Sequence, residues 1–391
     1  MLLFNSICIL GNELLPNLTD FGNYLAAFII VCYVISLFPL KNIILTNGVI
    51  EVIGIIALVG IYEIISYFRV QLPTYIISFI VWTVLAMFIA MQKFDLKKML
   101  DISLFISGFT MVLGVIKSDS YEAMTWSYAL FPCIAVAFVH FYLYNRESNM
   151  WMKAVYIISI ITTIVFIFSS NRGGLVSLVC LFFLLLIRKF KNGTSKKRIL
   201  INALFVLTLL MAIFFAESLL IALYRFLSSH NIKIDAINKT YRMLLEDNIT
   251  NNRDELYRFA WKGFLANPIF GNGIGAFAVN HGGWPHNILL QLLYEGGITL
   301  AVIVLMPVVV MSVKMVAQKE VDSKVYALFV LLFSIAVPRL LFTSELWNTQ
   351  SYWMLLVFSL LPKIGKTKNR YIVNSNFIVA HNSMVKSKAD Y

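Results

Sequence analysis

Charged side chains are scarce in this chain of 391 residues, and acidic side chains are scarcer than basic ones. Only 13% of the residues are Asp, Glu, Lys or Arg, whereas 60% are hydrophobic and the mean hydropathy is +0.80. An ordinary soluble domain carries roughly twice that share of charge. The composition therefore excludes a typical soluble protein and indicates a chain that folds within a lipid bilayer.

Cysteine is also rare, and its placement excludes two kinds of site. The four cysteines, Cys8, Cys32, Cys133 and Cys180, lie inside apolar runs without CxxC spacing, so neither a disulfide framework nor a zinc site is indicated. The net charge of +12 could suggest a nucleic-acid partner. The basic residues, however, lie mainly in short loops between apolar runs, which is how a membrane protein is oriented, so we expect no nucleic acid.

Long apolar runs recur along the chain. A helix of about 20 apolar residues crosses a hydrocarbon core roughly 30 Å thick. On this basis the sequence predicts eleven spans, near residues 21–40, 43–68, 73–91, 99–116, 121–143, 151–170, 173–190, 199–224, 286–313, 323–342 and 347–362. A twelfth candidate, near 2–15, is short and carries polar residues. The predicted fold class is an all-α polytopic bundle of 11–12 spans, forming one integral membrane domain over residues 1–391.

The basic residues are divided unequally between the two sets of alternating loops. One set holds most of them, namely Lys41, Lys93, Lys97, Lys98, Arg146, Lys153, Arg188, Lys189, Lys191, Lys196, Lys197, Arg198, Lys314, Lys319 and Lys324. The positive-inside rule places this set in the cytoplasm. The one long polar segment, residues 225–285, then becomes a large periplasmic loop between spans.

Part of this loop has the pattern of a helix. In NNRDELYRFAWKGFLANP, Asn252 and Glu255 form a capping box and Pro268 ends the helix. The following FGNGIGAF predicts a flexible glycine turn that leads back to the membrane. We therefore expect short helices within residues 225–285.

Five cationic or titratable residues gather on the predicted outer face. Arg172 opens a span, Arg253 and Arg258 lie on the loop helix, His286 opens the next span, and Arg339 approaches from the penultimate span. Few carboxylates are available to pair with these arginines, which are costly at the edge of the hydrocarbon unless paired or functional. Guanidinium groups without acids suit an anion, and phosphate fits them best. A lipid-linked phosphate or pyrophosphate is the predicted ligand.

Three segments carry a family resemblance: SNRGGLVSL, RDELYRFAWKGFLANPIFGNGIGAF and HNILLQLLYEGGI. Their order, spacing and predicted membrane side resemble the bacterial O-antigen polymerase and O-antigen ligase superfamily over residues 171–301. The resemblance implies a glycosyltransferase of the inner membrane that needs no metal or other cofactor. It also implies an undecaprenyl-pyrophosphate-linked oligosaccharide as substrate, with membrane lipids and a chain-length regulator protein as further partners.

The resemblance assigns roles to individual residues. Arg172 and Arg253 match arginines that hold the pyrophosphate, and His286 matches a histidine that activates the acceptor hydroxyl; we add Arg258 and Arg339 to the predicted pyrophosphate site. Such a histidine is a suitable general base near neutral pH. Two departures occur: Tyr257 stands where the family usually has Trp, and Leu300 replaces a glycine of the ligase pattern.

Simpler interpretations remain open for each residue. His286 could begin a helix and contact water, Arg172 could anchor at the lipid headgroups, and Arg253 could pair with Asp254. His281 could join His286 in a metal site, although no third ligand lies nearby. Gly271, Gly273 and Gly275 resemble a phosphate-binding loop only superficially, because no strand precedes them.

The predicted function is O-antigen or capsular polysaccharide polymerisation, within lipopolysaccharide or capsule biosynthesis. A ligase that transfers the glycan to lipid A core is the alternative within the same enzyme class, and it binds the same donor. A flippase for the repeat unit is the alternative from another class. Transporters usually carry paired repeats and polar groups near the midplane, whereas here the polar features gather around one external loop.

Overall fold

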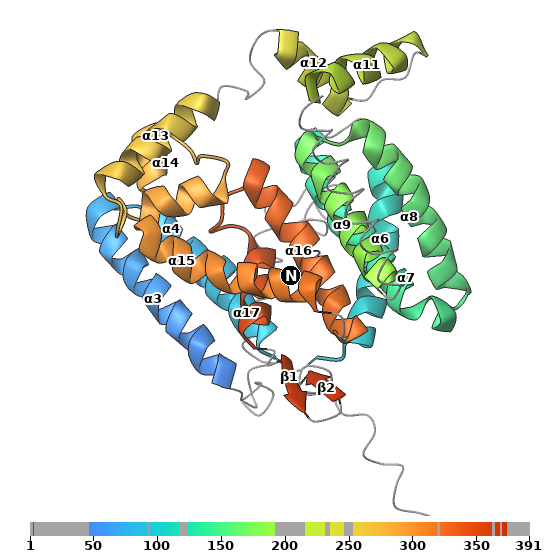
Figure 1. Cartoon of the computed structure of the whole chain (residues 1–391), viewed down its shortest axis with the longest axis horizontal. Helices are drawn as coiled ribbons and strands as arrows, with labels where there is room; N and C mark the ends of the chain where they lie inside the picture. Colours follow the sequence, from blue (N-terminus) through green and yellow to red (C-terminus); the bar gives the residue numbers. More distant parts are fainter. Residues whose placement is uncertain are drawn as a thin grey trace, which may run out of the picture.

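The computed structural model describes residues 3, 47–92, 94–116, 123–191, 216–230, 235–245, 253–318, 321–361, 364–367 and 370–373. This part of the chain is almost entirely helical (Figure 1), which confirms the predicted all-α membrane fold. The exception is a short antiparallel hairpin after the last helix, in which Ile364 pairs with Val373.

The described part of the chain consists mainly of helices. In chain order they are α3 (Asn47–Val70), α4 (Pro73–Ser78), the π-helical η2 (Phe79–Val84), α5 (Leu85–Ala90), α6 (Leu96–Ile116), α7 (Ala123–Tyr144), the 3-10 helix η4 (Asn145–Glu147), α8 (Met150–Ser169), α9 (Arg172–Lys191), α11 (Ala216–Ser229), α12 (Asp235–Leu245), α13 (Arg253–Ala266), α14 (Ala276–His281), α15 (Ile288–Ala317), α16 (Ser323–Phe342) and α17 (Gln350–Leu360). The hairpin strands are β1 (Ile364–Thr367) and β2 (Arg370–Val373).

Seven helical segments of the described chain are long and apolar enough to cross a membrane. They are α3, the continuous α4–η2–α5 segment, α6, α7, α8, α15 and α16, and each coincides with a predicted span. The apolar part of α9, Gly173–Arg188, is shorter. The predicted spans at 2–15 and 21–40, and most of that at 199–224, lie outside the described residues.

One predicted span differs in length. The run at 347–362 contains a helix of only 11 residues, α17, which is about 17 Å long and too short to cross a bilayer by itself. The reason is that residues 343–349 form a loop that is tied into the protein by side chains from other helices. Trp347, for example, donates from its Nε1 to Glu295 at 2.8 Å.

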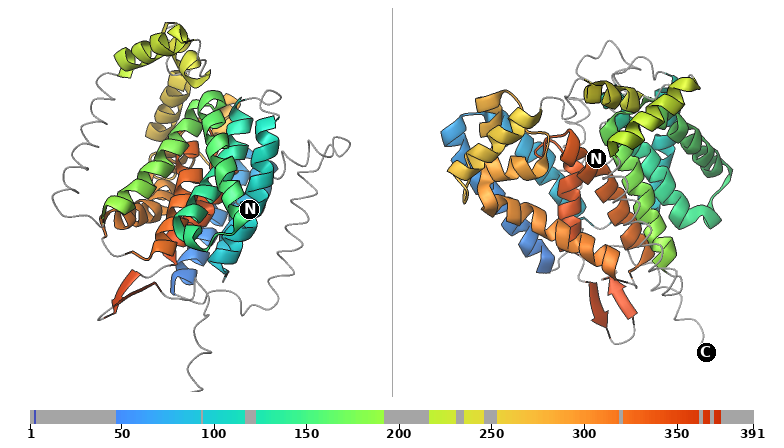
Figure 2. Two further views of the ribbon diagram at one scale, coloured as in Figure 1. Left: turned by 90° about the vertical axis from the view of Figure 1, so that its right-hand side faces the viewer. Right: turned by 45° about the horizontal axis from the view of Figure 1, so that its top comes forward.

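Two groups of helices flank a central pair. Helices α6 to α9 lie on one side and α3, α13, α14 and α15 on the other, with α16 and α17 between them (Figures 1 and 2). Helix α16 packs on α7 and α9 and also on α17, so it joins the two groups. Large side chains such as Tyr326, Trp347 and Trp353 are fully buried around it. Because lipid supplies no hydrophobic drive between helices, this close packing is what holds the bundle together.

A break in α15 fixes the position of α13. Gly297 has φ 63°, outside the helical region, so the chain kinks there and main-chain groups lose their helical partners. The segment that follows α13 supplies new partners: Ile298 N donates to Pro268 O at 2.9 Å, and Thr299 N donates to Ile269 O at 3.3 Å. Helix α13 is thereby attached to α15 by main-chain hydrogen bonds.

The glycine turn completes this attachment from the other side of the kink. Gly273 N donates to Glu295 O at 2.8 Å, and Asn272 N donates to Tyr294 O at 2.9 Å. Gly271 has φ 68°, and a Cβ there would lie 2.5 Å from the Glu295 carbonyl. The turn that the sequence predicts as flexible is thus a hydrogen-bonded structure that only glycine fits.

Candidate functional site

The loop between α16 and α17 is the centre of the polar cluster on the predicted outer face. The carbonyl oxygen of Thr343 accepts a hydrogen bond from His286 Nδ1 at 2.9 Å and another from Trp284 Nε1 at 3.2 Å. His286 comes just before α15 and Thr343 just after α16. These bonds hold the start of α15 next to the end of α16.

The contact with Thr343 determines which nitrogen of His286 carries a proton. A carbonyl oxygen only accepts hydrogen bonds, so Nδ1 must be protonated, and the neutral ring then has its lone pair on Nε2. His286 has φ 53°, a left-handed conformation that is strained for a non-glycine residue and is common at functional sites. The helix cap is provided by the neighbouring Asn287, whose side chain accepts from Leu289 N at 3.0 Å.

The surroundings favour the neutral imidazole. Burial lowers the pKa of His286 below its ordinary value, the hydrogen bond to Thr343 opposes this shift, and the nearby positive charge of Arg253 adds to it. A neutral imidazole with an available Nε2 is the form that removes a proton from a hydroxyl group.

Two of the predicted arginines lie at the same loop. Arg253, the first residue of α13, donates from Nη1 to the carbonyl of Phe342. Arg339 donates from Nε to Ser344 Oγ, and its guanidinium lies 4.5 Å from the ring centroid of Tyr128. Neither guanidinium forms a salt bridge with a carboxylate within the described residues. Neither charge is therefore neutralised by a carboxylate of the described chain.

Arg172 begins α9, but its side chain lies outside what the structure describes. Its neighbour Gly173 is informative, because a Cβ at that position would lie 2.9 Å from the Tyr128 hydroxyl and 3.6 Å from Thr343 Oγ1. The start of α9 thus approaches the same loop as Arg253, Arg339 and His286.

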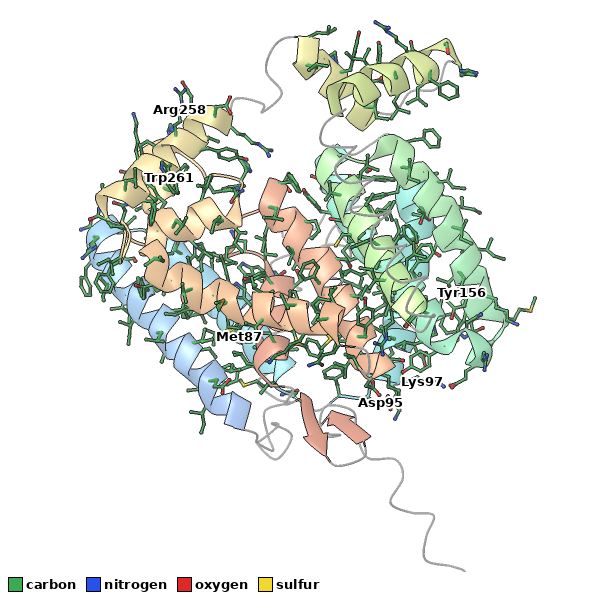
Figure 3. All side chains as sticks on the ribbon, in the orientation of Figure 1. Met87, Asp95, Lys97, Tyr156, Arg258 and Trp261 are labelled. Atoms are coloured by element: carbon green, nitrogen blue, oxygen red, sulfur yellow. The ribbon has the colours of Figure 1, made fainter. Side chains whose placement is uncertain are left out.

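Arg258 is the predicted site residue that stands apart. It lies five positions after Arg253 on α13, which turns it to another face of the helix. Its side chain is exposed and points away from the bundle, as does that of Trp261 (Figure 3). His281 is also exposed, and its ring lies tilted against Phe259 with 4.4 Å between centroids.

The sequence did not single out three further residues of the cluster. Tyr128, on α7, contacts Thr343 Oγ1 through its hydroxyl as well as Arg339 through its ring. Trp284 donates from its side-chain Nε1 to the main-chain carbonyl of Thr343. The only available signal was proximity in sequence, since Trp284 precedes His286 by two positions and Thr343 follows Arg339 by four.

Buried carboxylates lie on the other side of the same loop. Glu295 accepts from Trp347 Nε1 at 2.8 Å and from Gly275 N at 3.2 Å. Glu345 accepts from Asn348 Nδ2 at 2.6 Å, and burial raises its pKa. These acids hold the loop in place rather than neutralising the guanidinium groups. Among the described residues no group of three His, Cys, Asp or Glu side chains is arranged to hold a metal ion.

Comparison with known proteins gives one family match, which covers the central part of the chain. A family model described as O-antigen ligase matches residues 157–305, a range that includes Arg172, Arg253, Arg258 and His286 but ends before α16 and the Thr343 loop. No curated protein matches the chain, and no solved structure does. Over these residues the match supports the resemblance to bacterial O-antigen polymerases and O-antigen ligases.

Proposed function

We propose that the protein transfers a glycan from a polyprenyl-pyrophosphate carrier, undecaprenyl pyrophosphate, to a sugar hydroxyl at the outer face of the inner membrane. The acceptor is a second lipid-linked repeat unit, so the enzyme is a polysaccharide polymerase for O-antigen or capsule. The observation that carries this proposal is the arrangement around Thr343, where a histidine with a defined base nitrogen lies beside two arginines that no described acid neutralises.

The arrangement matches the charges that develop in such a reaction. The acceptor oxygen forms a bond to the anomeric carbon while its proton passes to His286 Nε2, and the bond from that carbon to the pyrophosphate oxygen breaks. The electron pair of this bond stays on the leaving pyrophosphate, whose negative charge grows. Arg253, Arg339 and, in this proposal, Arg172 stabilise that charge more in the transition state than in the ground state.

An O-antigen ligase is the second candidate, and the description of the matching family favours it. Both enzymes would bind the same donor, so the cluster at Thr343 serves either of them. The departure at Leu300 argues for the polymerase, because the ligase pattern has a glycine there. The Leu300 side chain is fully buried and would contact a Cβ added at Gly296, so Leu300 is part of the packing around the kink in α15.

The two candidates differ in what accumulates when the gene is deleted. If the protein is the polymerase, the deletion strain makes lipopolysaccharide carrying a single repeat unit. If it is the ligase, O-antigen is lost from lipid A core while polymer persists on the carrier lipid. Normal polymer on lipid A core in the deletion strain would contradict both candidates, and lipid-linked units confined to the cytoplasmic leaflet would point to a flippase.

A further inference from the structure

A cavity lies at the end of the bundle opposite the Thr343 cluster. Its volume is about 590 Å³, within the range of small-molecule sites, and it lies between α7 and α9. Tyr128 and Arg146 are separated by about 27 Å along α7 and η4 if both are treated as helix, so the cavity and the Thr343 cluster lie on opposite sides of the bilayer. The basic loops assign the end with the cavity to the cytoplasm.

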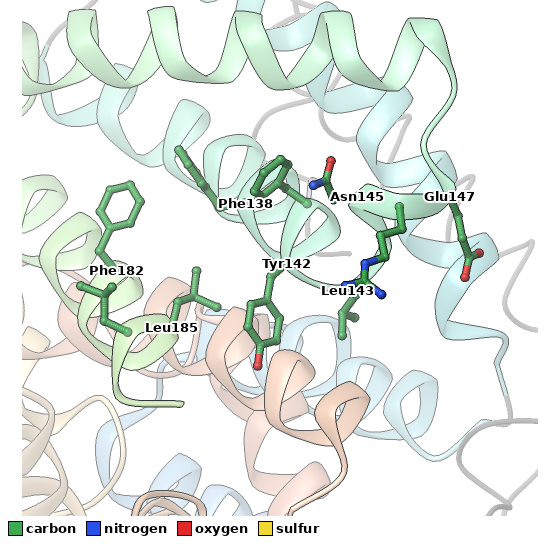
Figure 4. A pocket seen from close by; sticks show the side chains of 10 residues that line it. Phe138, Tyr142, Leu143, Asn145, Glu147, Phe182 and Leu185 are labelled. Atoms are coloured by element: carbon green, nitrogen blue, oxygen red, sulfur yellow. The ribbon is translucent and has the colours of Figure 1, made fainter. Parts of the chain in front are cut away.

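The cavity is apolar at one end and polar at the other (Figure 4). Phe138 and Phe182 close the apolar end, with their rings edge to face and 4.8 Å between centroids. Phe141 and Leu186 also line the cavity, and they are 45% and 48% exposed, so the cavity opens sideways toward the lipid. An apolar lining that is open to the bilayer fits an acyl chain.

The polar end carries one positive charge that no described side chain neutralises. Asn145, Arg146 and Glu147 line this end. Glu147 is paired with Lys97 at 2.5 Å, so its charge is already compensated. The exposed guanidinium of Arg146 forms no salt bridge within the described part of the chain. A guanidinium at the headgroup level binds phosphate well, and basic pockets between spans on the cytoplasmic side bind anionic lipids.

We propose that this cavity binds an anionic phospholipid of the inner leaflet, with one acyl chain against Phe138 and Phe182 and the headgroup phosphate on Arg146 and Asn145. Free phosphate would leave the apolar end empty, and the choline ammonium of a zwitterionic lipid would bring a second positive charge close to Arg146. The site is independent of the glycan-transfer site, so neither proposal depends on the other.

The test uses the purified full-length chain in detergent, supplied with phosphatidylglycerol, phosphatidylcholine or inorganic phosphate. Bound lipid is counted by native mass spectrometry and the Tm is measured in parallel. We expect phosphatidylglycerol to bind about tenfold more tightly than phosphatidylcholine, and Arg146→Gln to remove this difference. Lys153→Gln is the matched control, since Lys153 is an exposed cation at the same end, on α8, that does not line the cavity.

A second variant tests the apolar end. Leu185→Trp fills the cavity next to Phe182 and should remove the tightly bound phosphatidylglycerol, whereas Arg146→Gln should remove only the preference for the anionic headgroup. The proposal is overturned if Arg146→Gln binds phosphatidylglycerol as the wild type does, if the two lipids bind equally to the wild type, or if inorganic phosphate raises the Tm as much as phosphatidylglycerol.

Discussion

The carbonyl of Thr343 accepts a hydrogen bond from Nδ1 of His286 at 2.9 Å, and this contact orients the imidazole ring. With Nδ1 occupied, Nε2 is the nitrogen that accepts a proton from substrate. The same loop receives Arg253 through Phe342 and Arg339 through Ser344. Residues from two helices, α13 and α16, and from the loop before α15 are therefore positioned by three consecutive residues.

The pH dependence of transfer should report on His286. Because burial and Arg253 both lower its pKa, the neutral form persists below the ordinary value of about 6.5, and activity should fall only at more acidic pH. Arg253→Gln removes a positive charge that disfavours the imidazolium, so the acidic limb of the residual activity should move to higher pH. The measurement is the pH profile of kcat/KM. Arg258→Gln should leave the limb in place, and an unmoved limb in Arg253→Gln would contradict the proposed proximity.

Arg339→Lys tests whether the guanidinium shape matters beyond its charge. Lysine keeps the positive charge but loses the planar group that contacts Tyr128 and the donor to Ser344. We expect kcat for glycan transfer to fall by at least about tenfold. The matched control is Arg258→Lys, which should retain wild-type kcat. Equal activity of Arg339→Lys and the wild type would argue against anion binding by this residue.

At the scale of elements, the attachment of α13 to the kink in α15 is what brings Arg253 toward His286. The kink frees main-chain groups, and the segment from Pro268 to Gly273 satisfies them. In a bilayer an unsatisfied main-chain group is especially costly, so the two elements are expected to form together. The helix that carries Arg253 is thus held by these main-chain hydrogen bonds as well as by the packing of Ala260 with Phe277 and Tyr294.

Gly297→Ala should disrupt this attachment. A Cβ at Gly297 would lie 2.4 Å from the Ile269 carbonyl oxygen, and φ is 63°. We expect a loss of stability of at least about 2 kcal/mol, seen as a lower Tm in detergent, together with a loss of activity. Gly283→Ala is the control, because nothing lies within 4 Å of its added Cβ. A Tm of Gly297→Ala equal to that of the control would show that the kink does not need glycine.

For the whole molecule, the sequence predicts the position of a helix wherever the apolar length of that segment alone determines it. Seven spans follow directly from apolar length, because a bilayer of fixed thickness demands it. The span predicted at 347–362 was too long, because its first residues are held in a loop by distant partners such as Gln291, whose Oε1 accepts from Leu346 N at 3.1 Å. Such contacts are made only after the helices pack.

The candidate site was also predictable only in part. Arg253, Arg339 and His286 were predicted as site residues because polar groups at the membrane edge are costly, and the structure places all three around one loop. Their role in transfer stays a prediction. Arg258 shares the residue type and the helix of Arg253, so only the orientation of α13 separates them. The role of the Thr343 carbonyl could not be predicted from residue type, because every residue has a main-chain carbonyl.

The predicted orientation of the whole molecule has a direct test. In a chain whose four native cysteines are changed to alanine, Arg258→Cys and Met150→Cys place single thiols on exposed positions at opposite ends of the bundle. An impermeant thiol reagent should label Arg258→Cys in intact spheroplasts and Met150→Cys only after the membrane is broken. The reverse order of labelling would place the Thr343 cluster in the cytoplasm.

The most direct test of the central claim is glycan transfer by the purified chain in proteoliposomes supplied with the undecaprenyl-pyrophosphate-linked repeat unit. The wild type should lengthen the glycan and release undecaprenyl pyrophosphate in equal amounts. His286→Ala should reduce the rate by at least about 10²-fold, whereas His281→Ala, on the exposed end of α14, should keep the wild-type rate. A His286→Ala enzyme as active as His281→Ala would contradict the assignment of the Thr343 cluster as the transfer site.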